Sequence, residues 1–519
     1  MSSFLSLSRI ENPVWLSSRD RQFLLSRLDE KKLFAEKLSL MMEEDLDSNG
    51  DLDELTQQHN KELSEIASIR NILAPVRRLH PELLSQIFRQ VGDSMDRTKA
   101  STKGPVHPVT MSHVCFVWRV TARSTCQLWT EYIHRSTRRK ISISAAMIPN
   151  YLQCSGALPI TTIDLDLESY STDRISAFME ILIPFCPRIR LLCLRLPFEG
   201  IHCIDLPRRS FALLEELELI TTVTRKQSKK GWKKSDGTFF RDCPRLRRFT
   251  AVGGLVYNWN PITTLPSDQI LELDLSCTVS LPTGIIYVGL VLPLRFLKVF
   301  SNVVVLILSF QMFEPEPLEL LALTSLALTT RDDSYSTFMD SLTAPNLISF
   351  KLSFMETRHG QSCSPFSPLL EFHRRCAAPI KELTLSRVVK ILTNELTTLL
   401  ALFPFLEKLE LLNCPRVEGK SIFETLKFQG QRDVAILVPK LTRFVFCESR
   451  YFGDDKQEAY DVSFAEFVES RWWPDMQEYR GVSRLQKVHC AFPKWRVESG
   501  DFFTRLEACE GLELSFECK

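Results

Sequence analysis

The sequence has no excess of charge of either sign and no long hydrophobic run. It contains 64 lysine and arginine residues against 63 aspartate and glutamate residues, so its formal net charge is +1. This balance does not favour a polyanion-binding protein, and an apolar fraction of 44% excludes a disordered chain. The stretch SNVVVLILSF is shorter than the roughly 18 apolar residues typical of a membrane-spanning helix, so we expect a buried strand there and no membrane segment.

The cysteines do not form the dense, even spacing of a disulfide framework. There are 15 of them, an odd number, and they are scattered singly. The first residues, MSSFLSLSRIENPVW, also lack the basic start and sustained apolar run of a secretory signal. We therefore expect free thiols in a reducing compartment, in the cytoplasm and/or the nucleus.

Recognisable catalytic motifs are lacking as well. The sequence has no nucleophile elbow, metalloprotease helix or paired-carboxylate motif, so nothing in it favours an enzyme. The stretch from Cys414 to Ser421 has a cysteine where a phosphate-binding loop has its first glycine, and we interpret it as an ordinary strand, loop and helix. RKQSKKGWKK, residues 225–234, is interpreted as a solvated insertion, with nuclear import or polyanion contact as the alternative.

The sequence also contains a group of histidine and cysteine residues, which are types that bind zinc, but their spacing matches no common zinc finger. We interpret them as part of a polar loop and expect no resident metal or cofactor. The four residues concerned are His359, Cys363, His373 and Cys376.

Two helices are predicted at the N-terminal end, over residues 17–45 and 51–72. The turn signal Ser48-Asn49-Gly50 separates them, which favours an antiparallel hairpin. Recurring apolar residues define the faces that we expect to pack, within a helical, coiled-coil-like segment of residues 1–70. They are Leu24, Leu28, Phe34, Leu38 and Met41 in the first helix and Leu52, Leu55, Leu63, Ile66, Ile69 and Ile72 in the second.

The turn between these helices carries an alternative hypothesis of calcium binding. Six residues from Asp45 to Asp53 fit positions 1 to 9 of an EF-hand loop, but Thr56 stands where the loop needs its bidentate glutamate. A solvated acidic turn with a capped helix is the preferred interpretation.

The next segment, residues 73–133, is predicted to form short amphipathic helices. Pro81 and Glu82 suit the first turn of a helix, because proline needs no hydrogen bond there and an acid complements the helix dipole. Leu84, Ile87 and Phe88 then begin an apolar stripe that continues at Val91. A second helix is predicted after a polar loop, with apolar positions that include Val114 and Trp118. Such small helices make a marginal core, so we expect apolar surface to be left for a partner.

In these residues the chain resembles an F-box, in the F-box-like form of large fungal families. One matching element contains Leu79, Pro81, Glu82, Leu83, Leu84, Ile87 and Phe88. The other contains Ser112, Val114, Cys115, Trp118, Arg119, Ala122, Ser124, Thr125, Leu128 and Trp129. His80 and Cys126 stand where the family has prolines. An ordinary helical hairpin whose tryptophans fill its own core is the alternative.

The resemblance implies a three-helix domain, residues 71–136, that binds a Skp-type adaptor of a cullin-RING ubiquitin ligase. The implied contact residues are those that match the family pattern most closely. They are Leu79, Pro81, Leu84, Ile87, Phe88, Val114, Trp118 and Trp129.

From about residue 155 onward one pattern, L-x-x-L-x-L, recurs. Successive copies are mostly about 24 to 35 residues apart, the spacing of leucine-rich repeats that have a strand and a helix in each unit. We therefore predict a solenoid over residues 150–519, because stacked units bury apolar faces that no single unit can bury. Its strands are expected at 160–165, 189–194, 214–219, 246–249, 270–275, 294–299, 323–328, 347–352, 380–385, 406–411, 441–446, 485–488 and 512–514.

In such a strand, the residues on either side of the middle leucine point away from the core and form the expected binding surface. Their charges alternate along the chain, which favours a protein substrate over a nucleic acid. For any single residue, simple solvation is the alternative. The candidates are Glu216, Glu218, Arg248, Glu272, Asp274, Phe296, Lys298, Lys351, Glu382, Lys408, Glu410 and Arg443.

Together these patterns predict an α/β chain: a helical hairpin, an F-box three-helix module and a leucine-rich-repeat solenoid with a parallel sheet lined by helices. The function that the resemblance implies is that of a non-catalytic substrate-recognition adaptor of a ubiquitin ligase. A repeat scaffold without any link to ubiquitin ligase is the main alternative. A calcium- or nucleotide-responsive protein is a third.

Overall fold

The computed structural model forms two compact units, which we describe separately. The helical unit comprises residues 1–132 and 146–161, and the sheet unit comprises residues 133–145 and 162–519. Within them the structure describes residues 16–44, 51–93, 108–134, 147–197, 200, 211–222, 240–253, 265–276, 278–281, 284–287, 294–310, 315–330, 334–355, 366–388, 393–414, 419–428, 436–447, 454–472, 481–492, 506, 509 and 511–518.

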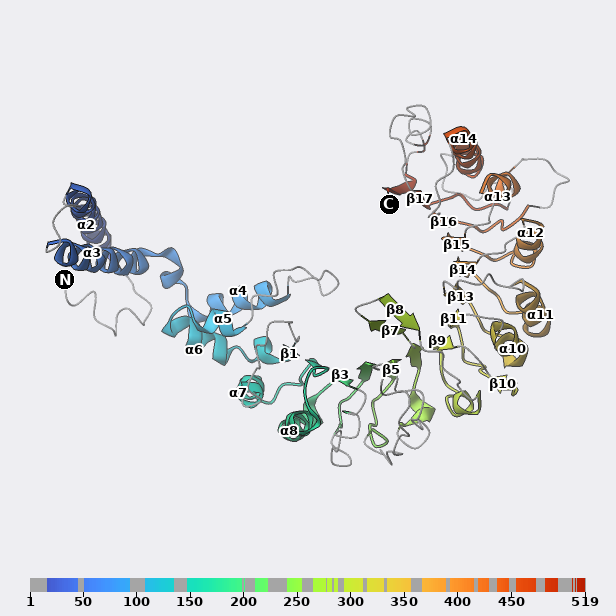
Figure 1. The fold of residues 1–519 in the computed structure, drawn as a ribbon, viewed down its shortest axis with the longest axis horizontal. Coiled ribbons are helices and arrows are strands. Elements are labelled where there is room, and N and C mark those ends of the chain that lie inside the picture. The colour runs from blue at the N-terminus through green and yellow to red at the C-terminus, as the bar shows by residue number, and fades with distance from the viewer. Residues whose placement is uncertain are drawn as a thin grey trace. The chain divides into compact units, whose positions relative to one another are not determined.

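The helical unit begins with a two-helix hairpin, α2 (Ser18–Glu44) and α3 (Asp51–Leu73), in the places where the sequence predicts helices (Figure 1). A capping box starts α2: the Ser17 amide donates to the Asp20 carboxylate, and the Asp20 amide donates to Ser17 Oγ. Lys31 lies between Glu62 and Glu65 at 2.8 and 2.9 Å and joins the two helices. Their apolar core contains Leu24, Leu28, Ala35, Ile66, Ile69 and Ile72.

A series of short helices follows in the same unit. They are the 3₁₀ helix η1 (Pro75–Arg78), α4 (Pro81–Asp93), α5 (Pro108–Ser112), α6 (Phe116–Ser124), the 3₁₀ helix η2 (Cys126–Trp129) and α7 (Met147–Gln153). Proline stands first in η1, α4 and α5, as expected where a backbone donor is dispensable. We call residues 75–129 the short-helix segment.

Residues 146–161 belong to the helical unit and not to the sheet unit, so the unit boundary differs from the one predicted near residue 150. The reason is α7. Its Tyr151 ring packs edge-on against Trp129 at 4.8 Å, and its hydroxyl donates a 2.8 Å hydrogen bond to the Glu131 carbonyl.

The sheet unit confirms the prediction of a mixed α/β fold with a long parallel sheet. Fourteen strands lie in the order β1-β2-β3-β4-β5-β6-β9-β11-β13-β14-β15-β16-β17-β18, and β1 (Glu131–His134) begins in the helical unit. The remaining strands are β2 (Thr162–Asp166), β3 (Leu191–Pro197), β4 (Glu216–Thr222), β5 (Arg248–Gly253), β6 (Glu272–Ser276), β9 (Val305–Phe310), β11 (Ser325–Thr330), β13 (Ser349–Phe354), β14 (Glu382–Ser386), β15 (Lys408–Leu412), β16 (Arg443–Cys447), β17 (Lys487–Phe492) and β18 (Glu513–Cys518).

Helices cover one side of this sheet, and α10 to α14 are stacked along it in Figure 1. They are α8 (Thr172–Leu182), α10 (Ser334–Ser341), α11 (Phe366–Cys376), α12 (Thr393–Ala401), α13 (Gly419–Leu426) and α14 (Asp454–Ser470), with the 3₁₀ helices η3 (Ile183–Arg188), η6 (Ser267–Gln269) and η7 (Leu294–Val299). The described part of the unit also contains two small sheets, antiparallel β7 (Thr278–Leu281) with β8 (Gly284–Tyr287) and parallel β10 (Leu318–Glu319) with β12 (Leu342–Thr343).

Neighbouring strands are in register, so each apolar position forms a continuous row. Leu273 pairs with Phe249 on one side and Leu306 on the other, and all three side chains are buried. The row continues in the same way through Leu326, Phe350, Leu383, Leu409, Phe444 and Val488. Each strand therefore buries its apolar residues against the copies before and after it.

The prediction of a strand at residues 294–299 is wrong. That stretch is the 3₁₀ helix η7, and the strand is β9. Leu297 in η7 and Phe300 and Val303 after it are buried at intervals of three residues and are joined by backbone hydrogen bonds of the same spacing. The apolar, β-branched run that follows suits the strand better. Phe296 and Lys298 therefore do not belong to the strand surface to which the sequence pattern assigned them.

Candidate interaction surfaces

Helix α4 is apolar on two neighbouring rows, of which it buries only one. Leu84 and Phe88 are each 2% exposed and form part of the core. Leu83, Ile87 and Val91, each four residues from the next, are 48%, 42% and 37% exposed. A helix that only had to pack within its own unit would carry polar residues in that second row.

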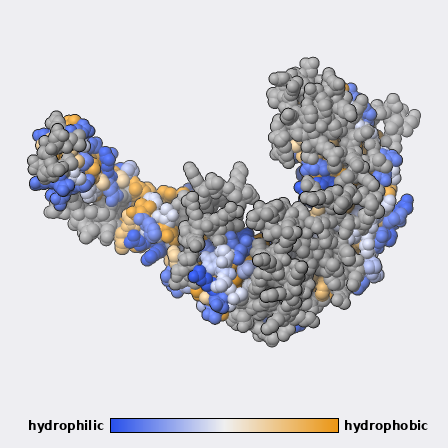
Figure 2. Space-filling model, in the orientation of Figure 1, coloured by the Kyte–Doolittle hydropathy of each residue, from blue (hydrophilic) through white to orange (hydrophobic). Residues whose placement is uncertain are grey.

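The segment from α5 to α6 shows the same division. Met111 and Ala122 are buried, whereas Val114, Phe116 and Val120 are exposed. Figure 2 shows hydrophobic residues gathered over the short-helix segment (Figure 2). We define the exposed apolar set by six residues: Leu83, Ile87, Val91, Val114, Phe116 and Val120.

The interior of the short-helix segment is held by aromatic and polar contacts. The Phe88 and Trp118 rings lie 4.9 Å apart, and Trp129 Nε1 donates a 2.7 Å hydrogen bond to the Ala122 carbonyl. Ser85 Oγ and Thr125 Oγ1 lie 2.9 Å apart and join α4 to the turn after α6. These contacts position α4 and α6 with their unburied apolar rows outward.

The structure divides the predicted adaptor contacts into two kinds. Leu84, Phe88 and Trp129 are buried inside the helical unit, so they support the segment and offer no surface. Leu79 and Trp118 are half-buried, and Pro81, Ile87 and Val114 are exposed. Four members of the exposed apolar set were not among the predicted contacts: Leu83, Val91, Phe116 and Val120. For α4, the spacing of Leu83, Ile87 and Val91 in the sequence is the signal that could have identified two of them.

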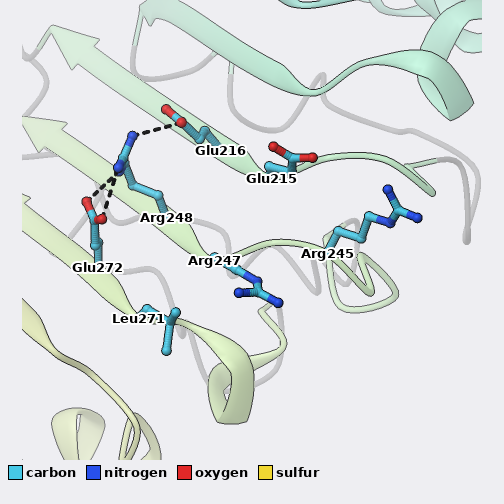
Figure 3. Close-up of a pocket in the computed structure, with 7 residues that line it drawn as sticks. All are labelled: Glu215, Glu216, Arg245, Arg247, Arg248, Leu271 and Glu272. Atoms are coloured by element: carbon cyan, nitrogen blue, oxygen red, sulfur yellow. Dashed lines mark hydrogen bonds and ion pairs between the residues drawn. The ribbon is translucent and has the colours of Figure 1, made fainter. Parts of the chain in front are cut away.

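On the sheet, an ion-pair network crosses β4, β5 and β6. Arg248 Nη1 lies 2.8 Å from Glu216, and its Nε and Nη2 donate to the two oxygens of Glu272 at 2.5 and 2.9 Å (Figure 3). The hydrogen bonds from Arg248 lower the pKa of the Glu272 carboxyl, and the bonds to Glu272 raise the pKa of the guanidinium. The three predicted surface residues thus bind one another across neighbouring strands.

A pocket of about 480 Å³ lies beside this network, lined by Glu215, Leu271, Arg245, Arg247 and the three networked residues. Arg245 and Arg247 are exposed and point away from the Arg248 cluster in Figure 3. Three arginines and three glutamates give the pocket mixed charge, which suits polar protein groups of either sign more than a simple anion.

Strands β13 to β16 carry a second group of predicted surface residues. Lys408 lies 2.8 Å from Glu410, whose other oxygen accepts a 2.7 Å hydrogen bond from Thr384. Burial raises the pKa of Glu410, but the hydrogen bonds from Lys408 and Thr384 outweigh burial and leave it lowered. Lys351 and Arg443 are exposed on the neighbouring strands.

The remaining predicted surface residues are placed as follows. Glu218 and Asp274 are half-buried in the middle of β4 and β6, and Glu382 at the start of β14 accepts a 3.1 Å hydrogen bond from Ser349. In η7, Lys298 forms a 3.0 Å ion pair with Glu316. Between the two charged groups, the same rows carry Val305, Ile307, Ser325 and Ala327 on β9 and β11. These rows therefore carry charged residues on β4 to β6 and on β13 to β16, and uncharged residues on β9 and β11 between them.

The stretches that resembled chemical motifs are described only in part. Residues 45–50, 225–234, 359, 363 and 415–418 lie outside the described residues. His373 and Cys376 lie on α11, where burial lowers the pKa of His373. Within the described ranges, no group of three or more histidine, cysteine, aspartate or glutamate residues is placed to hold a metal ion.

One buried charge was not predicted. Arg471, directly after α14, is 1% exposed, and its guanidinium donates to the carbonyls of Leu426, Leu437 and Val438 at 2.8, 2.6 and 3.1 Å. Burial lowers the pKa of Arg471 to about 10. Val438 has a φ of 43°, an uncommon value for a β-branched residue, so Arg471 holds a strained turn. No local sequence signal marks this arginine as buried.

In the part of the chain that the structure describes, no helix combines the length and apolar character needed to cross a membrane. The chain matches no protein-family model and no curated protein in sequence.

Proposed function

We propose that the protein is a substrate-recognition adaptor of an SCF-type cullin-RING ubiquitin ligase. In this proposal residues 71–136 are an F-box-like module that binds a Skp-type adaptor, and the sheet unit is a leucine-rich-repeat solenoid that binds a protein substrate. The protein itself has no catalytic role, because ubiquitin transfer belongs to the associated ligase. It acts in the cytoplasm or the nucleus.

The observation that carries the proposal is the exposed apolar set. Covering a large apolar side chain contributes roughly 1.5–3 kcal/mol, so six such residues on α4, on α6 and in the turn before α6 represent substantial unused binding energy. Exposed apolar surface of this kind is typical of protein interaction sites. The set also lies within the residues that resemble the F-box, where that family binds its adaptor.

The rows on the sheet support the second half of the proposal. In a leucine-rich solenoid these rows line the open face of the parallel sheet, away from the helices. Several of their charged groups are paired with one another, and the residues on β9 and β11 between them are small or apolar. A mixed surface of this kind suits a folded protein partner better than a nucleic acid, which needs excess positive charge.

A repeat scaffold that uses the same two surfaces without a ubiquitin ligase is the alternative. The helical unit would then bind some other protein through the exposed apolar set. Copurification of a Skp-type adaptor with the full-length chain separates the two functions.

Replacing Ile87 and Val114 together with serine should weaken binding of purified Skp-type adaptor by at least tenfold. Both side chains are exposed, so their loss should remove contact area and leave the core intact. The measurement is a pull-down titration with full-length protein, accompanied by a thermal melt that should not change.

Phe405→Ser provides the matched control, because Phe405 is as exposed as Val114 but lies in the sheet unit. It should leave adaptor binding unchanged. Undiminished binding by the Ile87/Val114 variant would show that the adaptor contact lies elsewhere, and no binding by the wild type would favour the scaffold.

A further inference from the structure

The two helices of the N-terminal hairpin differ in how many large apolar side chains they expose. Helix α3 exposes one large apolar side chain, Leu63, among the residues whose side chains are described. Helix α2 exposes six within a similar length, beyond those that it buries against α3. They are Phe23, Leu25, Leu33, Phe34, Leu40 and Met41.

Three of these residues lie on one line along α2. Phe23, Phe34 and Met41 are 50%, 40% and 38% exposed and are separated by 11 and 7 residues, so they share one face. Arg27, Glu30 and Lys37 fill the same line between them, which completes an alternation of four- and three-residue steps from Phe23 to Met41. This alternation is the seam of a coiled coil. Continued toward the first turn of α2, the seam includes Asp20.

The order of residues in the seam fits a second copy of itself, running in the opposite direction. An antiparallel copy can be placed so that Phe23 faces Phe34 of the partner and Arg27 faces Glu30 of the partner. The next layer then pairs Asp20 with Lys37. Every layer joins either two apolar side chains or two opposite charges, and two-fold symmetry repeats each layer once.

Other arrangements of the same seam lack this match. In a parallel pair each charge faces its own copy, Arg27 against Arg27 and Glu30 against Glu30, which is repulsive. An antiparallel pair shifted by one heptad sets Arg27 against Lys37 and Glu30 against Phe34. The seam therefore specifies one direction and one register.

We propose that α2 is a homodimerisation helix, which pairs antiparallel with α2 of a second copy through Phe23, Arg27, Glu30 and Phe34. Within one chain Arg27 Nη1 already lies 2.7 Å from Glu30 Oε2, so both charged groups are held in the seam. Pairing two hairpins would give a four-helix arrangement that covers the apolar face that each hairpin leaves open. The inference does not depend on the proposed function.

The first test is the oligomeric state of the full-length chain, measured by sedimentation equilibrium over micromolar concentrations. The wild type should be a dimer, and Phe34→Ser should raise its dissociation constant by about a hundredfold, because each dimer contains the Phe23–Phe34 layer twice. Leu33→Ser and Leu40→Ser are matched controls: both residues are more exposed than Phe34 but lie on the opposite side of α2 from the hairpin core. They should leave the dimer unchanged.

A charge-exchange experiment tests the register. Arg27→Glu and Glu30→Arg should each be monomeric, because each places like charges in the central layers of its own dimer. An equimolar mixture of the two variants should form a heterodimer, since each glutamate then faces an arginine. Pull-down of one variant by an affinity-tagged copy of the other measures this, and circular dichroism checks that both keep their helices.

Heterodimer formation can only come from contact between chains, because mixing leaves the two like charges at positions 27 and 30 within each variant unchanged. A monomeric wild type at tens of micromolar would overturn the proposal and assign the face to a different protein. Failure of the mixture to associate would overturn the register. Equal weakening by Leu33→Ser and Phe34→Ser would also contradict it.

Discussion

The sheet unit buries most of its large apolar side chains, whereas the helical unit leaves many of them exposed. Twenty large apolar side chains are markedly exposed among the described residues, and fifteen of them belong to the much smaller helical unit. In the fourteen-stranded sheet each inner strand has a near copy of itself on both edges, and in register. In the helical unit α2, α4 and α6 each bury one apolar row and leave another open.

This difference follows from repetition. A stacked strand packs against the next segment of the same chain, so its apolar side chains are buried within the chain. This burial continues for as long as the repeats continue. Single helices in a small unit have no such neighbour, and one hairpin or short-helix core covers only one face of each. The comparison predicts that apolar residues of the sheet unit determine stability, whereas the exposed ones of the helical unit determine association.

The largest effect on stability is expected from Arg471, the buried charge that closes the turn before β16. Arg471→Leu keeps most of the buried volume but leaves the carbonyls of Leu426, Leu437 and Val438 without their donor. Unpaired buried groups of this kind cost roughly 1–3 kcal/mol each, so a loss of about 3–5 kcal/mol in the free energy of unfolding is expected. Urea denaturation of the full chain measures it.

Arg443→Leu is the matched control for this prediction, because Arg443 is an exposed arginine on β16 itself. Its replacement should change stability by about 0.5 kcal/mol or less. A similar loss in both variants would mean that the charge of arginine matters in general and that the three buried hydrogen bonds do not.

A second prediction tests the register of the sheet with two adjacent residues. Leu273 is 2% exposed between Phe249 and Leu306, so Leu273→Ala should leave a cavity and cost about 2–5 kcal/mol. Glu272 is half-exposed and ion-paired to Arg248, so Glu272→Ala should cost only about 0.2–1 kcal/mol. Thermal melts of the two variants side by side decide it. Equal losses, or the reverse order, would show that β6 does not have the described register.

Most of the sheet could be predicted from the sequence because the same constraint is repeated many times. The L-x-x-L-x-L pattern predicts both where each strand lies and which of its side chains point into the core. Because the strands pair in parallel and in register, the same pattern also predicts which residues are neighbours. It failed at residues 294–299, where the buried positions suit a 3₁₀ helix as well as a strand and the true strand follows at Val305. Strand β1 was missed because its four residues carry no such pattern.

The candidate surfaces were harder to predict because they depend on which apolar row a helix buries. On α4 the sequence shows Leu83, Leu84, Ile87 and Phe88 as one wide apolar stripe, and only the packing of Phe88 against Trp118 shows which half remains open. The unit boundary after α7 and the burial of Arg471 likewise depend on contacts between distant segments. The contacts that the F-box resemblance implies include both core and exposed residues of the short-helix segment.

The smallest effect on stability is expected from Leu83, and it tests the helical side of the comparison directly. Leu83→Ala removes a side chain that is 48% exposed and should change the free energy of unfolding by about 0.5 kcal/mol or less. Its neighbour Leu84 is 2% exposed, so Leu84→Ala should cost about 2–5 kcal/mol. If chemical denaturation of the full chain showed that both leucines matter equally, Leu83 would have to be covered within the chain, and the exposed apolar set would lose its value as an interaction site.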